Sequence, residues 1–207
     1  MAHKTGRWKT IMVRDYFNEK AESWDSYASE RNHSKLEKMI KRLDLNPGNT
    51  VLDVGTGTGI FLPYLIGKVG INGQVIAIDI AEKMLLQARN KNFSGKISFL
   101  CANVEYIPIK AETCDAVVYY SSFPHFQDKL KALTETRRVL KKSGSIFICH
   151  TSGRNEINRI HMNVPLLHHD RLPNVTDMTQ LLKTAGFTGI RVEDEEESYF
   201  AYGRRPN

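Results

Sequence analysis

The sequence predicts an α/β fold, because short apolar runs alternate along the chain with segments of helical spacing. The clearest case is residues 50–66, where an apolar run is followed by a glycine-rich turn and then by a helix-compatible run. A second apolar run, at 74–79, ends in an acidic residue and again precedes a helical segment. Strand, turn and helix therefore recur in the order typical of a sheet with helices packed on it.

Length and composition fit one globular domain. The chain has 207 residues, of which 41% are hydrophobic and 25% are charged, enough for a single sizeable core. We expect no membrane-spanning helix and no secretory signal. The cysteines match neither a disulfide framework nor a zinc pattern, which favours reduced thiols and a cytoplasmic location (Cys101, Cys114 and Cys149).

The net charge of +6 permits an anionic partner without requiring one. The basic residues are scattered, and they do not alternate with aromatic residues as on a nucleic-acid platform. A solvated basic surface is the preferred interpretation, so we expect no stable nucleic-acid complex.

The glycine-rich turn suits a ligand that approaches the backbone closely. Gly55, Gly57 and Gly59 allow a sharp bend, and the start of the next helix offers free N–H groups. A dinucleotide fingerprint requires G-x-G-x-x-G, whereas the third glycine here arrives one residue early. A nicotinamide-dependent oxidoreductase is therefore the least favoured function.

Asp79 ends the second predicted strand. A carboxylate at such a position can accept hydrogen bonds from both hydroxyls of a ribose. The alternative is that Asp79 only caps the helix predicted at 81–88. The predicted strands at 96–101, 113–121 and 145–150 and the predicted helices at 35–43, 129–140 and 176–185 complete the alternation, and the strands at 189–193 and 198–203 form a closing hairpin.

The turn with Asp53 before it resembles motif I of the class I methyltransferases, which bind S-adenosylmethionine (SAM). The next segments match the same family in order, through Asp79, Ala81, Met84, Leu85 and Ala88, then Asp115, Val117, His125, Phe126 and Asp128. The lead-in resembles that of the UbiE-like (methyltransferase type 11) group, through Phe17, Ala21, Trp24 and Asp25. The resemblance covers about residues 15–203.

The resemblance implies a Rossmann-like, doubly wound sheet with helices on both faces. Its seven strands are expected in the order 3-2-1-4-5-7-6, with the last strand antiparallel. Residues 1–207 would form a single SAM-dependent methyltransferase domain, with 1–30 as a lid segment and 150–175 as a substrate-pocket insertion. Residues 1–11 are polar, so we expect them to be loose.

The resemblance also implies where the cofactor binds. The expected contacts come from the turn, the end of the second strand, the loop after the third strand and the end of the fourth (Asp53, Gly55, Thr56, Gly57, Gly59, Asp79, Ile80, Asn103, Val104 and Ser121). Relatives carry an acid at the position of Asn103, whose side-chain carbonyl can still accept a hydrogen bond from the adenine amine.

Substrate contacts are expected from two regions. Tyr16, Trp24 and Tyr27 could form a cage for a sulfonium or an apolar substrate, or could simply pack a helix onto the core. If 154–161 is helical, Arg154, Asn158 and His161 lie on one face of it.

Three histidines are candidate catalytic residues: His125, His150 and His161. An imidazole titrates near neutral pH and can act as a general base. Metal ligation, with help from His168 and His169, lacks any fixed ligand spacing, so no metal is expected. The remaining alternative is that these side chains only position a loop.

The function implied is methyl transfer from SAM to a small-molecule acceptor, with release of S-adenosylhomocysteine, by a monomer or homodimer. One alternative is a non-catalytic SAM-binding module. Another is an RNA methyltransferase, although Ser121-Ser-Phe-Pro124 lacks the Asn/Asp-Pro-Pro-Tyr/Phe pattern that clamps a base. The acceptor, and whether it needs a base, stay open.

Overall fold

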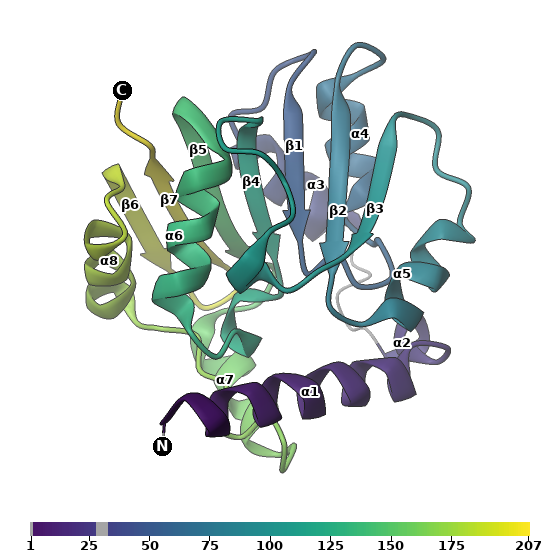
Figure 1. Cartoon of the computed structure of the whole chain (residues 1–207), viewed down its shortest axis with the longest axis vertical. Helices are drawn as coiled ribbons and strands as arrows, with labels where there is room; N and C mark the ends of the chain where they lie inside the picture. Colours follow the sequence, from purple (N-terminus) through teal and green to yellow (C-terminus); the bar gives the residue numbers. More distant parts are fainter. Residues whose placement is uncertain (1, 28–32) are drawn as a thin grey trace.

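The computed structural model describes residues 2–27 and 33–207, with side chains for 8–26 and 33–207. One sheet runs through the molecule in the order β3-β2-β1-β4-β5-β7-β6 (Figure 1), which confirms the predicted order. Its strands are β1 (Thr50–Val54), β2 (Gln74–Asp79), β3 (Ile97–Cys101), β4 (Cys114–Tyr120), β5 (Leu140–His150), β6 (Thr188–Asp194) and β7 (Tyr199–Arg204).

Strand direction changes only at β7. β1 pairs in parallel with β2 and β4, and the parallel pairing continues outward to β3 and β5. β7 pairs antiparallel with both β5 and β6, which confirms the predicted antiparallel last strand. The carboxyl ends of the five parallel strands therefore meet at one edge of the sheet, where ligands of open α/β sheets bind.

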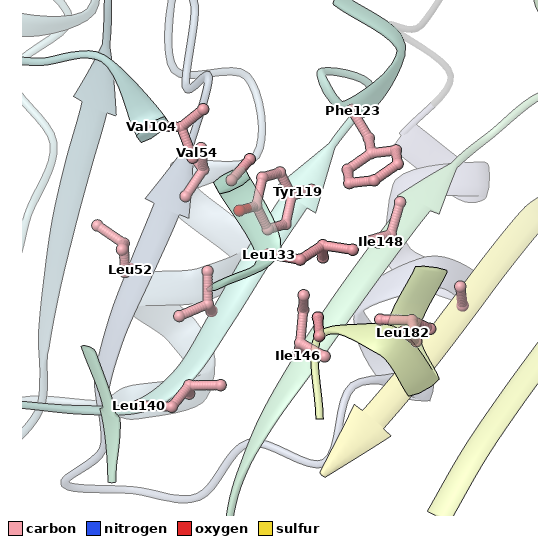
Figure 2. Close-up of a cluster of buried hydrophobic side chains, with 14 of the residues drawn as sticks. Leu52, Val54, Val104, Tyr119, Phe123, Leu133, Leu140, Ile146, Ile148 and Leu182 are labelled. Carbon is pink, nitrogen blue, oxygen red and sulfur yellow. The ribbon is translucent and has the colours of Figure 1, made fainter. Parts of the chain in front are cut away.

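The central strands are mostly apolar because both of their faces are covered. Leu52 and Val54 of β1 point into one buried cluster, drawn in Figure 2, whereas Val51 belongs to the cluster on the opposite face. Helices α6 (Lys129–Val139) and α8 (Val175–Thr184) cover the first face, and α3 (His33–Arg42) and α4 (Leu62–Val69) cover the second. The doubly wound arrangement predicted from the sequence is thus present.

Among the described residues, four further helices and two short 3₁₀ turns surround the carboxyl edge. Helix α5 (Glu82–Arg89) follows β2, and the 3₁₀ turns η2 (Val104–Tyr106) and η3 (Phe123–His125) follow β3 and β4. Figure 1 shows α1 (Ala2–Lys20) crossing this edge, with α2 (Trp24–Tyr27) at its end and α7 (Arg154–Met162) beside it. No helix in the described ranges is both long and apolar enough to cross a membrane.

The prediction that residues 1–11 are loose is wrong, because α1 is helical from Ala2 onward. The helix is held in place by tertiary contacts that cannot be predicted from its polar sequence. Phe17 packs with the small cluster formed by Ala21, Ala81 and Met84. Lys9 forms a 2.7 Å ion pair with Asp170, which lies 161 residues further along the chain.

Candidate functional site

A cavity of about 300 Å³ lies at the carboxyl edge of the sheet. Its floor is made by strand ends and the turns that follow them, including Val54, Asp79 and Ser121. Its roof comes from α1, through Thr10, Val13, Tyr16 and Phe17, and from the region of α7, through Ile157, Ile160, His161, Val164 and Leu167. The cavity is therefore bounded both by the predicted cofactor turn and by the segments predicted to cover it.

Asp79 links the glycine-rich turn to the end of β2. One carboxylate oxygen accepts a 2.8 Å hydrogen bond from the Gly57 amide, and the other accepts a 2.8 Å bond from the Ala81 amide. Burial raises the pKa of Asp79, while these backbone amides act in the opposite direction. Asp79 thus supports the start of α5, as the capping alternative expected, and also lines the cavity.

The three glycines of the turn have different structural roles. Gly55 has a φ of +70°, and an added Cβ would lie 2.5 Å from the Cβ of Ser122, so no side chain fits there. Gly57 has a φ of +55° and open space within 4 Å, which leaves its backbone approachable from the cavity. At Gly59 a Cβ would meet Leu62 at 2.9 Å, so this glycine serves the packing of α4 and does not line the cavity.

Three buried polar atoms that belong to cavity-lining residues have no hydrogen-bond partner among the described residues: Oγ1 of Thr56, Oγ of Ser121 and Nε2 of His150. Ser121 also has a φ of +52°, which is uncommon for a residue other than glycine. An unsatisfied buried polar group costs about 1–3 kcal/mol. A polar ligand in the cavity would remove this cost, and SAM supplies hydroxyl, amine and carboxylate groups that can do so.

The residues predicted to contact the adenine lie at the cavity, and Asn103 among them also caps a 3₁₀ turn. Ile80, Asn103 and Val104 all line the cavity. Oδ1 of Asn103 accepts a 2.9 Å hydrogen bond from the Glu105 amide and caps η2. A carbonyl oxygen has two lone pairs, so one remains for the adenine amine that the sequence predicted as its partner.

Asp53 differs from the other predicted cofactor residues. It does not line the cavity, and its side chain is only 2% exposed within the sheet. Burial raises its pKa to about 7. The structure therefore places Asp53 beside the turn, away from the cavity surface.

The described aromatic residues of the lead-in line the cavity, and one of them also packs against its neighbours. Tyr16 and Trp24 line the cavity. Trp24 also meets Phe17 edge to face at 5.4 Å, and both rings pack against the small cluster under α1. Tyr27 lies outside the residues whose side chains are described.

Asp170 gathers charged and polar groups at the roof of the cavity. Its Oδ2 lies 3.0 Å from Nδ1 of His125, and its Oδ1 lies 2.7 Å from Nζ of Lys9. Its backbone carbonyl accepts a 2.7 Å bond from Nδ1 of His161. The rings of His125 and His161 are 4.8 Å apart. The sequence drew attention to the neighbouring His168 and His169, but it gave no sign that Asp170 contacts His125.

His150 lies deeper, at the end of β5, and is only 2% exposed. Burial lowers its pKa to about 3, and the charges of His125 and His161 act in the same direction. Burial also lowers the pKa of His161. His150 is therefore a neutral imidazole at neutral pH and a weak proton acceptor, better suited to hydrogen bonding than to general-base catalysis.

Arg154 and Asn158 are engaged elsewhere, although α7 is helical as predicted. Nε of Arg154 lies 2.6 Å from Oδ2 of Asp194. The side chain of Asn158 exchanges two hydrogen bonds with the backbone of Leu172, at 2.8 and 3.3 Å. Neither residue lines the cavity, so their contacts hold α7 and the segment after it in place.

His168 and His169 also lie outside the cavity lining. The His168 ring stands 3.8 Å from that of His169, and its Nδ1 contacts the carbonyl of Pro165. Within 2–27 and 33–207, no group of three or more His, Cys, Asp or Glu side chains is arranged to hold a metal ion.

Comparison with known proteins independently supports the resemblance to methyltransferases. The family model described as a methyltransferase domain (Methyltransf_11) matches residues 52–148. The ubiquinone/menaquinone biosynthesis C-methyltransferase UbiE of Marinomonas sp. (strain MWYL1) is 34% identical over 117 residues, which are 55% of this chain and 47% of that protein. The chain thus spans about half the length of this curated relative.

Solved structures match over almost the whole chain. A SAM-dependent methyltransferase from Aquifex aeolicus is 28% identical with a TM-score of 0.71, and the match covers 91% of this chain and 98% of that one. A Haloferax volcanii protein, solved in complex with the Trm112 methyltransferase activator, has a TM-score of 0.76. It is 20% identical over 92% of this chain and 98% of its own, so this likeness shows the fold alone.

The sheet order, the turn bound by Asp79 and these matches agree with those of SAM-binding α/β proteins. The chain is thus similar to the class I SAM-dependent methyltransferases and to the UbiE-like group, and its residues 52–148 match a methyltransferase domain.

Proposed function

We propose that the protein transfers a methyl group from SAM to a small-molecule acceptor held beneath α1. The observation that carries this proposal is that one cavity has two unlike halves. One half is polar and is built from the glycine-rich turn, Asp79 and Asn103. The other half is largely apolar and is closed by α1 and α7, through Val13, Phe17, Ile157, Ile160, Val164 and Leu167.

The chain's own residues would bind, orient and enclose the reactants. Asp79, the turn amides and Asn103 would hold the cofactor, which supplies a methyl group already activated by a sulfonium. Catalysis then requires mainly in-line positioning and the exclusion of water. The side chains of α1 and α7 would perform both tasks because they cover the half of the cavity that faces the predicted acceptor.

The size and lining of the cavity favour a small acceptor over RNA. A cavity of about 300 Å³ that α1 covers leaves little room for a polynucleotide. Curated relatives include a ubiquinone/menaquinone biosynthesis C-methyltransferase and a demethylmenaquinone methyltransferase, and these names also favour a small molecule with an apolar body. A cytoplasmic location and a monomeric or homodimeric state stay predictions.

Calorimetric titration with SAM, S-adenosylhomocysteine and NAD in parallel tests the cofactor part of the proposal. We expect micromolar binding of the first two compounds and none of NAD, because the turn has the wrong spacing for a dinucleotide. Formation of S-adenosylhomocysteine is then followed with pools of small hydroxylated, amine and thiol compounds. Tight SAM binding without turnover on any pool would favour the non-catalytic module, and salt-sensitive RNA binding with turnover on RNA would favour the RNA methyltransferase.

A further inference from the structure

Asp170 is placed to fix the orientation of two histidines at once. Its carboxylate contacts Nδ1 of His125, and its backbone carbonyl contacts Nδ1 of His161. The side chain is only 2% exposed, and the ion pair with Lys9 of α1 keeps it in the carboxylate form. The bonds to His125 and Lys9 lower the pKa of Asp170, against the effect of burial.

These contacts determine which ring nitrogen of each histidine carries the proton. A carboxylate and a carbonyl can only accept hydrogen bonds, so Nδ1 of His125 and Nδ1 of His161 must be the donors. In a neutral imidazole the other nitrogen is then an acceptor. Neither Nε2 atom has a hydrogen-bond partner in the part of the chain that the structure describes. Both residues line the cavity, and each has one imidazole lone pair that no described residue uses.

We propose that His125 is the general base of the reaction, that Asp170 is its positioning residue, and that the acceptor is an apolar molecule which presents a hydroxyl group to this histidine pair. The proposal rests on the proposed methyl transfer. A hydroxyl group donates one hydrogen bond and suits a wall of acceptors. A thioether has no proton to donate. An ammonium group would add a further positive charge close to those of Lys9 and the sulfonium, which repel it.

The proton and electron balance of the step is simple. The hydroxyl proton moves to Nε2 of His125 while an electron pair of the acceptor oxygen forms the bond to the methyl carbon. The electrons of the carbon–sulfur bond stay on sulfur. The positive charge that began on the sulfonium ends on the His125 imidazolium, where the Asp170 carboxylate stabilises it.

Lys9 connects this machinery to the helix that covers the cavity. Its ammonium and the His125 ring contact different oxygens of the same carboxylate, so α1 helps to hold Asp170 in the orientation that His125 needs. Phe17 of α1 also meets the His125 ring edge to face at 5.1 Å. The base would therefore be fully oriented only when α1 covers the cavity.

Nitrogen-15 NMR of the histidine rings tests the proposal without cofactor or substrate. At pH 8.5, where an ordinary imidazole is neutral, His125 and His161 should both carry their proton on Nδ1. Asp170→Asn should abolish this preference in His125 and keep it in His161, whose partner is a backbone carbonyl. The matched control His169→Gln, at the exposed residue beside Asp170, should change neither.

Two results would overturn the proposal: a wild-type His125 protonated on Nε2, or an Asp170→Asn protein in which the His125 proton stays on Nδ1. The wild-type spectrum decides the first point even if the variant does not fold. Absence of SAM binding in calorimetry would instead contradict the proposed function, and it would leave the ring spectra unaffected.

A second arm tests the class of acceptor with fragments of one ring size. Phenol, thioanisole and toluene are titrated into protein saturated with S-adenosylhomocysteine. Phenol should shift the Nε2 resonance of His125 by hydrogen bonding, while thioanisole and toluene should leave it in place. Equal shifts with all three, or a shift with thioanisole alone, would contradict a hydroxyl-bearing acceptor.

Discussion

At the scale of single residues, Asp79 shows how one side chain can serve the apo and the ligand-bound protein. Each carboxylate oxygen already accepts one backbone amide, from Gly57 or from Ala81. Each oxygen has further lone pairs, so a ribose diol can bind without breaking these bonds. The same residue therefore fixes the turn and keeps lone pairs available for the proposed cofactor.

Asp79→Asn should weaken SAM binding by about 10- to 100-fold, which corresponds to about 1.5–3 kcal/mol for hydrogen bonds to a charged group. The asparagine side chain keeps only one acceptor oxygen. Its NH₂ group would take the place of the other oxygen and face the backbone N–H of Gly57 or Ala81, where two donors cannot form a hydrogen bond. Calorimetry measures the affinity. Glu82→Gln is the control, because Glu82 is exposed and does not line the cavity. Unchanged affinity in Asp79→Asn would contradict the placement of the cofactor.

The raised pKa of the buried Asp53 carboxyl group leads us to expect a specific dependence of the folding stability on pH. Its pKa is about 7 in the folded protein, against an ordinary value of 3.8. Because the folded value is raised, the stability that Asp53 contributes is fully present below pH 3.8 and is lost as the pH rises through 7. Asp53→Asn removes this term, so its free energy of unfolding relative to wild type should increase by about 2 kcal/mol from pH 5.5 to pH 8.

Urea denaturation at the two pH values measures that difference. The exposed residue Asp44 supplies the control, since Asp44→Asn removes one carboxylate without altering the buried site. If Asp53→Asn and wild type differ by the same amount at both pH values, burial of the Asp53 charge does not limit stability.

At the scale of elements, α1 and α2 are joined to the cofactor turn by Asp25. Its Oδ1 accepts a 2.6 Å bond from the Thr58 hydroxyl, and its Oδ2 lies 2.7 Å from Nζ of Lys91. Thr58 belongs to the glycine-rich turn and lines the cavity. The covering segment and the floor of the cavity are therefore coupled through one carboxylate.

Asp25→Ala should weaken SAM binding by about tenfold and speed amide exchange in α1, because a charge-assisted bond of about 1.5 kcal/mol is lost. Calorimetry and hydrogen exchange measure the two effects. Asp15→Ala is the control on the same segment, since Asp15 is exposed and pairs only with its neighbour Arg14 among the described residues. Equal exchange in both variants would show that Asp25 does not hold the segment.

Local patterns were sufficient to predict most elements. Apolar runs and turn residues indicated every strand. Several bounds differ slightly, and the largest difference is the start of β5, at Leu140 where the prediction began at 145. α1 was not predicted at its N-terminal end, because its apolar contacts come from one short stretch near Phe17. A polar segment that folds by docking on a distant element leaves little periodicity in its own sequence.

The same difference between local and distant contacts separates the site residues that were predicted from those that were not. Residues at the end of a strand or just after it, such as Asp79, Asn103 and His150, line the cavity as predicted. Asp170 was not predicted because its partners His125 and Lys9 are 45 and 161 residues away. Arg154 and Asn158 were expected in the substrate site from helical spacing alone, but spacing does not specify what the face packs against.

At the scale of the whole molecule, the cavity joins parts of the chain that are otherwise distant. Strand ends of the sheet, the N-terminal helix and α7 all contribute to its wall. A ligand that satisfies the unpaired atoms of Thr56, Ser121 and His150 and contacts α1 should bind the folded protein and not the unfolded chain. Its binding free energy should therefore appear as added stability.

Thermal unfolding should show this coupling directly. SAM or S-adenosylhomocysteine at 100 times its dissociation constant adds about 2.7 kcal/mol, which in a chain of this size raises the Tm by about 5–10 °C. NAD at the same concentration should leave the Tm unchanged. Asp79→Asn, at the same SAM concentration, should show a much smaller shift, whereas Asp25→Ala should show an intermediate one because the turn still binds when α1 is loosened. A full shift in Asp79→Asn would mean that the stabilising ligand binds somewhere other than the carboxyl edge of the sheet.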